Sequence, residues 1–393
     1  MNKVKIGFLW HNVSSGNLGV GALSIGNMIL VDRVCQNLGI DADFFTIGDN
    51  EVTSEQNKAL VERQIGRKFE HITISVKELI SNPIKLKSYI KMIKDFDLVL
   101  DIGAGDSFSD IYGNRRFLIQ VFTKLVNAIF ARKSVLSPQT IGPFKSRFAE
   151  IVSRFIIRNT SLVFARDDIS FKVGKEFGSC NLGTDVALSM PYSTVREVSD
   201  KIKVGINVSG LLWNGGYTRD NQFGLAHNYK DYINELIESF LSVENIEIHL
   251  VSHVIATSPV QKIEDDYAAC IEVAELFPRC IVAPRFTNPI EVKNYISSFE
   301  YFTGARMHAT IAAFSSGVPV TPYAYSRKFK GLYTTLGYDK VLEAKELSLK
   351  NAIKMNVDHF NKRIQIKLEL QGLTDKKNQL TEKYTSALEG VLK

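Results

Sequence analysis

The stretch DLVLDIGAG, residues 97–105, decides how this chain folds. It is a short apolar run that closes at aspartate and glycine, which is typical of a buried strand followed by a tight turn. The segment FLIQVFTKLVNAIFARK at 117–133 then places apolar residues at helical spacing, and another apolar run, SVLSPQ, follows at 134–139. This order of strand, helix and strand predicts a βαβ unit in a parallel sheet.

The same alternation continues on both sides of this stretch. A polar segment without apolar period, 191–201, interrupts it once, and no strand candidate remains after about residue 341. Further strand candidates are 4–10, 42–48, 161–167, 203–209, 245–254, 280–285, 299–306 and 317–326. We therefore predict an α/β protein with two Rossmann-like domains that face a cleft, 1–195 and 196–345, and a C-terminal helical segment, 346–393, packed on the body. In such sheets, ligands bind beyond the carboxyl ends of the strands.

The amino-acid composition argues against several classes of protein. The 393 residues are 45% apolar and carry a net charge of +6, which fits a globular protein and is compatible with small anions or anionic membrane surfaces as partners. We expect no nucleic-acid partner, because no basic block with interleaved aromatics is present. The four cysteines form no CxxC pair, and no apolar run reaches about 20 residues. These features predict a cytoplasmic protein that neither is secreted nor spans a membrane; they do not indicate an oligomeric state.

Two glycine-rich loops follow strand candidates in the first half. In HNVSSGNLGVGALSIGN (11–27), Asn17 and the glycines offer N–H groups to an anion or to sugar hydroxyls, although the spacing fits neither GxGxxG nor a P-loop. In DIGAGDSFSDIYGNRR (101–116), Gly105 permits close approach of a ligand, and Asp106 or Asp110 could bind sugar hydroxyls or act as a base. The alternatives are a tight turn in the first loop and a helix cap at Asp106.

Charged side chains end two further strand candidates. Arg166 carries the planar fork that suits a carboxylate or phosphate, but the aspartates that follow it could also form a local salt bridge. His253 ends the segment HLVSHV, where a lone histidine is more often hydrogen-bonded scaffold than catalyst. No HEXXH or other pattern with metal-ligand spacing occurs, so we expect no metal site.

The segment TGARMHA places Arg306 and His308 where an apolar strand candidate ends and a helix of small residues begins. An arginine fork beside a helix N-terminus makes a site for a carboxylate or phosphate. Lys328, after the next strand candidate, adds positive charge on the same sheet edge. The alternative is that all of these are solvated charges at strand ends.

Taken together, the chain resembles the polysaccharide pyruvyl transferase family. The matching segments are, in family order, the loop at Asn17 and Gly19, DLVLDIGAGDSFSD (97–110), SPQTIGPF (137–144), VFARDDIS (163–170), LGTDVAL (182–188), VGINVS (204–209), VSH (251–253), TGARMHATIAAFSSGVPV (303–320) and YSRK (325–328). Two positions depart from the family pattern: Val20 stands where an aspartate is usual, and Ala104 stands in a run of three glycines.

The resemblance implies a two-domain fold similar to the glycosyltransferase B-type fold. It also implies transfer of the pyruvyl group of phosphoenolpyruvate, as co-substrate and without metal or cofactor, onto a sugar as a cyclic ketal, in bacterial surface polysaccharide synthesis. The acceptor would then be a sugar such as galactose on a polyprenyl diphosphate, which would bring the protein to the inner face of the membrane. The donor side would be the second domain and the acceptor side the first.

Site roles follow from the same resemblance. Arg306 and His308 would be catalytic, with His308 as the general acid, and Arg166 and Lys328 would complete the donor site. Acceptor binding would fall to Asn17, Gly105, Asp106, Asp110 and His253. Two rivals stay open: a nucleotide-sugar glycosyltransferase of the same fold, and a non-catalytic sugar-binding relative. Aromatic residues in LLWNGGYTRDNQFG (211–224) could stack on a sugar, touch a bilayer or anchor the loop.

Overall fold

The computed structural model describes residues 3–49, 54–105, 108–111, 113–194 and 200–393. The chain divides into two compact units. Unit 1 consists of residues 1–15, 23–190 and 376–393, and unit 2 of residues 16–22 and 191–375. The division after residue 190 falls near the expected boundary. In contrast, residues 16–22 belong to unit 2, and the expected C-terminal segment is shared between the units.

Unit 1 is built on a parallel sheet with strand order β3-β2-β1-β4-β5-β6-β7. Its strands are β1 (Val4–Leu9), β2 (Ala42–Gly48), β3 (Phe69–Thr73), β4 (Leu98–Asp101), β5 (Ser134–Gln139), β6 (Leu162–Ala165) and β7 (Asn181–Leu182). Apolar side chains of the central strands are fully buried, as expected for a sheet covered on both faces.

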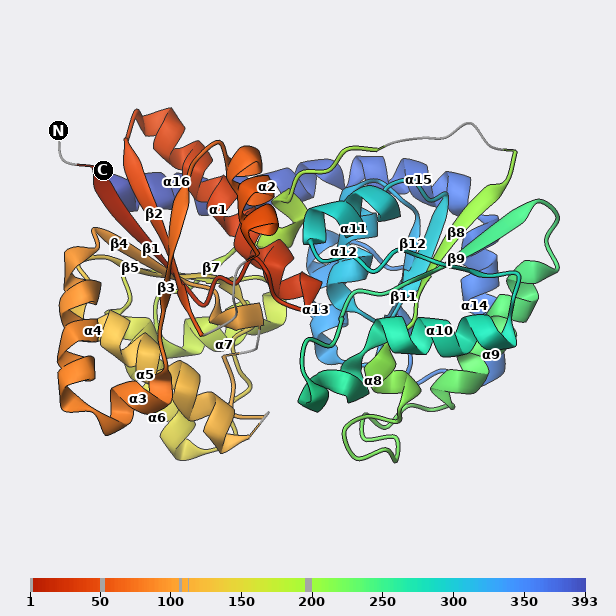
Figure 1. Ribbon diagram of the computed structural model, residues 1–393, viewed down its shortest axis with the longest axis horizontal. Helices are drawn as coiled ribbons and strands as arrows, with labels where there is room; N and C mark the ends of the chain where they lie inside the picture. Colours follow the sequence, from red (N-terminus) through yellow and green to blue (C-terminus); the bar gives the residue numbers. More distant parts are fainter. Residues whose placement is uncertain (1–2, 50–53, 106–107, 112, 195–199) are drawn as a thin grey trace. The chain divides into compact units, whose positions relative to one another are not determined.

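Helices cover both faces of this sheet. Figure 1 shows α1 and α16 on one face and α3, α4, α5 and α6 on the other. The helices are α1 (Leu18–Leu38), α2 (Glu55–Ile65), α3 (Val76–Ser81), α4 (Pro83–Asp95), α5 (Asn114–Phe130), α6 (Arg147–Asn159), α7 (Asp168–Phe177) and α16 (Thr374–Leu392). Side-chain caps start several of them, such as Ser146 at α6, whose Oγ accepts a hydrogen bond from the N–H of Ala149.

Unit 2 contains a second parallel sheet, with strand order β10-β9-β8-β11-β12-β13. Its strands are β8 (Ile202–Asn207), β9 (Ile246–Val251), β10 (Ile281–Val282), β11 (Tyr301–Gly304), β12 (Val320–Ala324) and β13 (Leu342–Glu343). Its helices are α8 (Gly210–Trp213), α9 (Tyr229–Leu241), α10 (Asp266–Leu276), α11 (Pro289–Ile296), α12 (Met307–Ser315), α13 (Arg327–Leu336), α14 (Leu349–Asn361) and α15 (Arg363–Gly372).

The predicted α/β class with two Rossmann-like sheets is confirmed. Every expected strand is present, and three further strands, β3, β7 and β13, were not expected. The expectation that no strand follows residue 341 is wrong, because β13 pairs with β12 through Tyr323 and Leu342.

Helix α1 is long and apolar enough to cross a membrane by length and composition alone. However, 83% of its most apolar window is buried inside the fold, and its side chains at Ile25, Met28 and Val31 are inaccessible to solvent. Among the described residues no other helix meets the same test. Within the fold, α1 serves as a core helix.

Candidate functional site

Unit 2 brings several of the predicted residues to one edge of its sheet. The chain leaves the neighbouring strands β8 and β11 toward opposite sides, so the carboxyl ends of these strands form a topological switch point, the usual ligand position in open α/β sheets. Asn207 ends β8, and Arg306 follows β11. The Oδ1 atom of Asn207 accepts a hydrogen bond of 2.7 Å from the backbone N–H of Arg306, which ties the two strand ends together.

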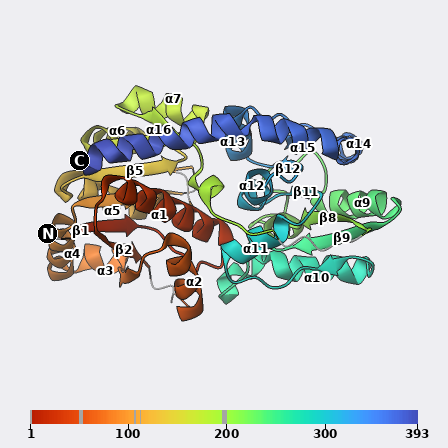
Figure 2. The same ribbon diagram turned by 90° about the horizontal axis from the view of Figure 1, so that it is seen from above.

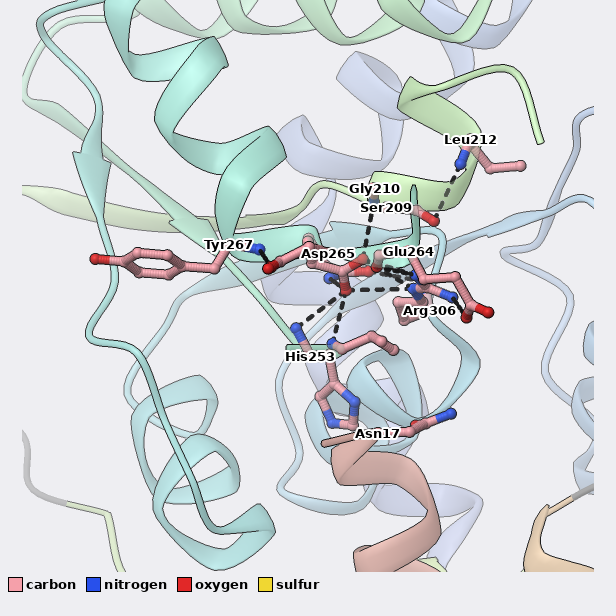
Figure 3. Close-up of polar contacts among 12 residues, drawn as sticks. Asn17, Ser209, Gly210, Leu212, His253, Glu264, Asp265, Tyr267 and Arg306 are labelled. Atoms are coloured by element: carbon pink, nitrogen blue, oxygen red, sulfur yellow. Dashed lines mark hydrogen bonds and ion pairs between the residues drawn. The ribbon is translucent and has the colours of Figure 1, made fainter. Parts of the chain in front are cut away.

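The guanidinium of Arg306 is held by a buried carboxylate (Figure 3). Its Nε and Nη2 atoms donate to Oδ1 of Asp266 at 3.0 and 2.8 Å, and Nη2 also donates to the backbone oxygen of Glu264 at 2.8 Å. Burial alone would lower the pKa of Arg306, but the interactions with Asp266, Tyr325 and Glu264 together outweigh burial and raise this pKa above its ordinary value. The remaining nitrogen, Nη1, lies 3.8 Å from the Glu264 carboxylate.

Asp266 organises the whole edge. Its side chain is fully buried and accepts backbone N–H groups from Gly210 at 2.8 Å, His253 at 3.1 Å and Val254 at 2.9 Å. One carboxylate thus fixes the loop after β8, the loop after β9 and the arginine after β11. Asp266 is not among the site residues predicted from the sequence. The available signal was the Asp265–Asp266 pair before a helix, in which Asp265 caps α10 and leaves Asp266 to face the core.

His253 is also buried at this edge, with 2% of its surface exposed. Its side chain points toward Asn17 in Figure 3. Burial, followed by the positive charges that His308 and Arg306 can carry, lowers the pKa of His253 to about 3. The imidazole of His253 is therefore neutral near pH 7.

The glycine-rich loop around Asn17 closes over His308. Asn17 forms an antiparallel bridge with Val254, and the N–H of Leu18 donates to the backbone oxygen of His253 at 3.1 Å. His308 lies in the first turn of α12, and a Cβ atom on Gly19 would come within 2.4 Å of its Nδ1. Glycine at position 19 thus lets the start of α1 approach the imidazole. The structure places Asn17 and His253, predicted for the acceptor, next to the pair predicted for the donor.

Two further features lie in the same unit. Lys328 is half-buried in the first turn of α13, after β12. Tyr325 stands just before it and makes an edge-to-face contact with Phe223, with 5.0 Å between ring centroids. Phe223 in turn lines a cavity of about 690 Å³ formed by the loop between α8 and α9. Trp213, the last residue of α8, is a buried anchor for that loop, because its Nε1 donates to Glu272 at 2.7 Å and only 3% of it is exposed.

The other predicted residues belong to unit 1, so their convergence with Arg306 stays a prediction. Arg166 is 3% exposed, and its Nη1 donates to Asp185 at 3.0 Å, whereas the adjacent Asp167 lies 4.0 Å from its Nε. The partner of Arg166 is thus a distant aspartate rather than only its sequence neighbour.

The second glycine-rich loop rests on a buried ion pair. Residues 103–105 all have positive φ angles, with Gly105 at 75° and the non-glycine Ala104 at 52°. Beneath the loop, the fully buried Nζ of Lys124 lies 2.6 Å from Oδ1 of Asp101, which also accepts the N–H of Gly103 at 2.8 Å. This pair fixes the backbone at the position where a ligand was predicted to approach Gly105.

Of the two aspartates predicted for acceptor binding, Asp110 is among the residues that the structure describes. Asp110 accepts the N–H groups of Lys145 at 2.8 Å and Ser146 at 2.9 Å. Burial raises the pKa of Asp110, but these hydrogen bonds outweigh it and hold the pKa below its ordinary value. Asp106 lies outside the described residues.

Solved structures that share this fold include UDP-N-acetylglucosamine 2-epimerases. UDP-N-acetylglucosamine 2-epimerase from Neisseria meningitidis, bound to UDP-GlcNAc, aligns over 100% of this chain and 99% of its own, with a TM-score of 0.56 and 12% identity. A UDP-N-acetylglucosamine 2-epimerase from Listeria monocytogenes aligns over 96% and 91%, also with a TM-score of 0.56 and 12% identity. At this identity the likeness concerns the fold alone, and it confirms the predicted resemblance to the glycosyltransferase B-type fold.

The sequence itself was compared with curated proteins and with family models. No curated protein matches this chain. The model of the polysaccharide pyruvyl transferase family matches residues 17–327, which include the Asn17 loop, both glycine-rich strand ends and the Arg306–His308 turn. The chain belongs to the polysaccharide pyruvyl transferase family.

Proposed function

We propose that this protein transfers the pyruvyl group of phosphoenolpyruvate onto a sugar as a cyclic ketal, on a lipid-linked precursor of a bacterial surface polysaccharide. The observation that carries the proposal is the Arg306–His308 turn at the sheet switch point of unit 2. There, an arginine anchored by Asp266 and an imidazole in the first turn of α12 are next to each other. Phosphoenolpyruvate carries two anionic groups on a small frame, which suits an arginine beside a helix N-terminus.

The reaction then has three steps. His308 gives a proton to the methylene carbon of phosphoenolpyruvate, which leaves a cation at C2. A sugar hydroxyl adds to C2 and loses its proton, a second hydroxyl displaces the phosphate, and its proton leaves as well. The products are the ketal and inorganic phosphate. Nη1 of Arg306, with Arg166 and Lys328, would stabilise the donor and the departing phosphate.

The base that accepts the hydroxyl proton is better sought among carboxylates than at His253. An imidazole with a pKa of about 3 binds a proton weakly. We assign His253 a binding role next to Asn17 instead. Both oxygens of Asp110 accept backbone N–H groups, so Asp106 is the stronger candidate for the base.

The proposal uses phosphoenolpyruvate as co-substrate and no metal or cofactor. An acceptor on a polyprenyl diphosphate places the reaction in the cytoplasm, at the inner face of the membrane. A nucleotide sugar is the second candidate donor, because the Neisseria epimerase with the same fold is bound to UDP-GlcNAc.

A ligand-induced shift in melting temperature, followed by turnover, tests the proposal. Phosphoenolpyruvate should raise the melting temperature of the full chain, and UDP should not. Release of phosphate with a galactoside acceptor should fall by roughly 10² to 10⁴-fold in His308→Gln. Arg306→Lys should weaken donor binding, because a point charge lacks the fork, whereas Lys at the exposed Arg279 should leave it unchanged. Stabilisation by UDP alone, or normal turnover of His308→Gln, would contradict the assignment.

A further inference from the structure

Helix α6 presents an apolar stripe to solvent. Phe148, Ile151 and Phe155 are 55%, 68% and 44% exposed. Their spacing of three and four residues puts them on one face of the helix, opposite the buried Ala149 and Ile156. Scattered exposed apolar residues are ordinary on a protein surface, but three on one face of a single helix form a patch.

Helix α5 extends the same patch. It packs between α4 and α6, and the three helices lie on the same side of the unit 1 sheet in both views (Figures 1 and 2). Leu118 and Ile129 of α5 are 48% and 54% exposed. They are eleven residues apart, so they project from nearly the same side of the helix, away from the buried Gln120 and Asn127. We call these five residues of α5 and α6 the α5–α6 face.

Positive charge surrounds this face. Helix α5 contains no acidic residue, α6 contains only Glu150, and α4 contains only Asp95, which is paired with Lys5 at 2.6 Å. The exposed basic residues nearest in sequence to the face are Arg115, Arg116, Arg132, Lys145, Arg147 and Arg158.

We propose that the α5–α6 face docks on the surface of an anionic lipid bilayer. Exposed aromatic and aliphatic side chains with a basic surround are the features of a helix that lies in the membrane interface, where cations attract anionic headgroups. A second copy of this chain fits less well, because a two-fold contact through this face would bring its basic residues against each other.

The position of the face suits a lipid-borne substrate. Helices α5 and α6 begin just after β4 and β5, so Leu118 and Phe148 lie toward the carboxyl edge of the unit 1 sheet. Gly105 and Asp110, predicted for the acceptor, are on the loop at that same edge. The link between docking and a polyprenyl-linked acceptor rests on the proposed function, whereas the docking itself does not.

Vesicle sedimentation of the full-length protein tests the docking. Binding should occur with vesicles of phosphatidylcholine mixed with phosphatidylglycerol, should weaken as salt is added, and should be weak with phosphatidylcholine alone. The triple variant Phe148→Ser, Ile151→Ser and Phe155→Ser, and the double variant Lys145→Glu and Arg147→Glu, should each reduce binding by roughly tenfold or more. These side chains are exposed, so the melting temperature should hardly change.

A matched control lies in unit 2. Ile364 and Leu368 of α15 are 72% and 63% exposed, and Ser at both should leave vesicle binding unchanged. Equal binding to neutral vesicles, undiminished binding of the triple variant, or a self-association that this variant abolishes would overturn the proposal. Turnover of phosphoenolpyruvate with a water-soluble galactoside should be the same in all variants. If that turnover is absent while anionic vesicles bind, the proposed function fails and the docking stands.

Discussion

At the scale of single residues, the site depends on a buried ion pair that joins positions 40 residues apart. Arg306 was visible in the sequence because it directly follows an apolar strand. Asp266 was not, because nothing local indicates that its carboxylate reaches three chain segments. Arginine at a strand end is readily interpreted as a clamp on a ligand, yet Nε and Nη2 of this arginine hold the protein together and Nη1 lies 3.8 Å from the Glu264 carboxylate.

Replacing Asp266 by Asn should therefore destabilise unit 2. The substitution leaves Arg306 buried without its counter-charge, and loss of one partner of a buried ion pair costs about 3 to 5 kcal/mol. Urea unfolding followed by Trp213 fluorescence, in a Trp10→Phe background, measures the change in free energy. Asp265→Asn is the matched control, because Asn caps a helix about as well as Asp and should change stability by less than about 0.5 kcal/mol. Equal effects of the two substitutions would refute the role given to Asp266.

Gly19→Ala should impair both activity and stability. The added Cβ would lie 2.4 Å from Nδ1, 2.8 Å from Cγ and 2.9 Å from Cβ of His308, so the side chain and the start of α12 must both shift, which outweighs the gain of about 1 kcal/mol from replacing glycine by alanine in a helix. We expect phosphate release to fall at least about tenfold and the melting temperature to fall as well. Gly390→Ala in α16, where the added methyl meets open space, should raise stability and leave turnover intact. Normal turnover in Gly19→Ala would show that His308 is not confined by this loop.

At the scale of elements, the sequence predicts the buried, apolar strands and misses three of the four short or charged strands at the sheet edges; the exception is the two-residue edge strand β10, which the apolar run at 280–285 predicts. β3, with the sequence FEHIT, is an edge strand that mixes charged and apolar residues, and β7 and β13 have two residues each. The run at 97–105 extends past its strand, because β4 ends at Asp101, where the carboxylate accepts the N–H of Gly103. Apolar periodicity detects burial on both faces, whereas a short edge strand is specified by its partner in the sheet.

The tertiary contacts of the C-terminal helix α16 also could not be predicted from its sequence. Its sequence predicts a helix, but not that Tyr384 lies within hydrogen-bonding distance of Asn27 (2.8 Å) and Ser137 (3.0 Å) in the core of unit 1. Asn27 also donates to Ser137 and contacts His11, so α16 is tied to a buried polar network.

Tyr384→Phe should loosen this helix. The substitution leaves the Oδ1 atom of Asn27 buried without its donor, and such a loss costs about 1 to 3 kcal/mol. Unfolding of unit 1, followed by Trp10 fluorescence in a Trp213→Phe background, should report it. Tyr217→Phe in unit 2, followed by Trp213 fluorescence in a Trp10→Phe background, is the comparison, because this tyrosine is 52% exposed and its hydroxyl contacts Glu264 at the surface. A cost at Tyr217 as large as at Tyr384 would argue against a structural role for the buried network.

At the scale of the whole molecule, each unit holds one of the two tryptophans and a buried histidine whose pKa is lowered to about 3. Trp10 and His11 belong to unit 1, and Trp213 and His253 belong to unit 2. Burial lowers the pKa of both histidines to about 3. Both units are therefore expected to lose stability in mild acid for the same reason, and the tryptophans allow each loss to be followed separately.

Whether stability rises or falls with pH depends on which state, folded or unfolded, binds more protons. In the unfolded chain, a histidine binds its proton near pH 6.5, whereas folded His11 binds it only near pH 3. The unfolded state thus holds more protons between these values, so stability is complete above pH 6.5 and falls as the pH is lowered toward 3. At pH 5 the loss from one such histidine is about 2 kcal/mol relative to pH 7.5, and any folded pKa below about 4 gives nearly the same loss.

His11→Gln should remove this part of the pH dependence from unit 1. In a Trp213→Phe background, the difference in unfolding free energy between pH 7.5 and pH 5 should shrink by about 2 kcal/mol, even if the substitution lowers stability at both pH values. His253→Gln in the same background should leave the Trp10 signal as pH-dependent as before, because His253 belongs to the other unit. A full pH dependence in His11→Gln would mean that His11 takes up its proton while unit 1 is still folded, and that carboxylates account for the acid sensitivity.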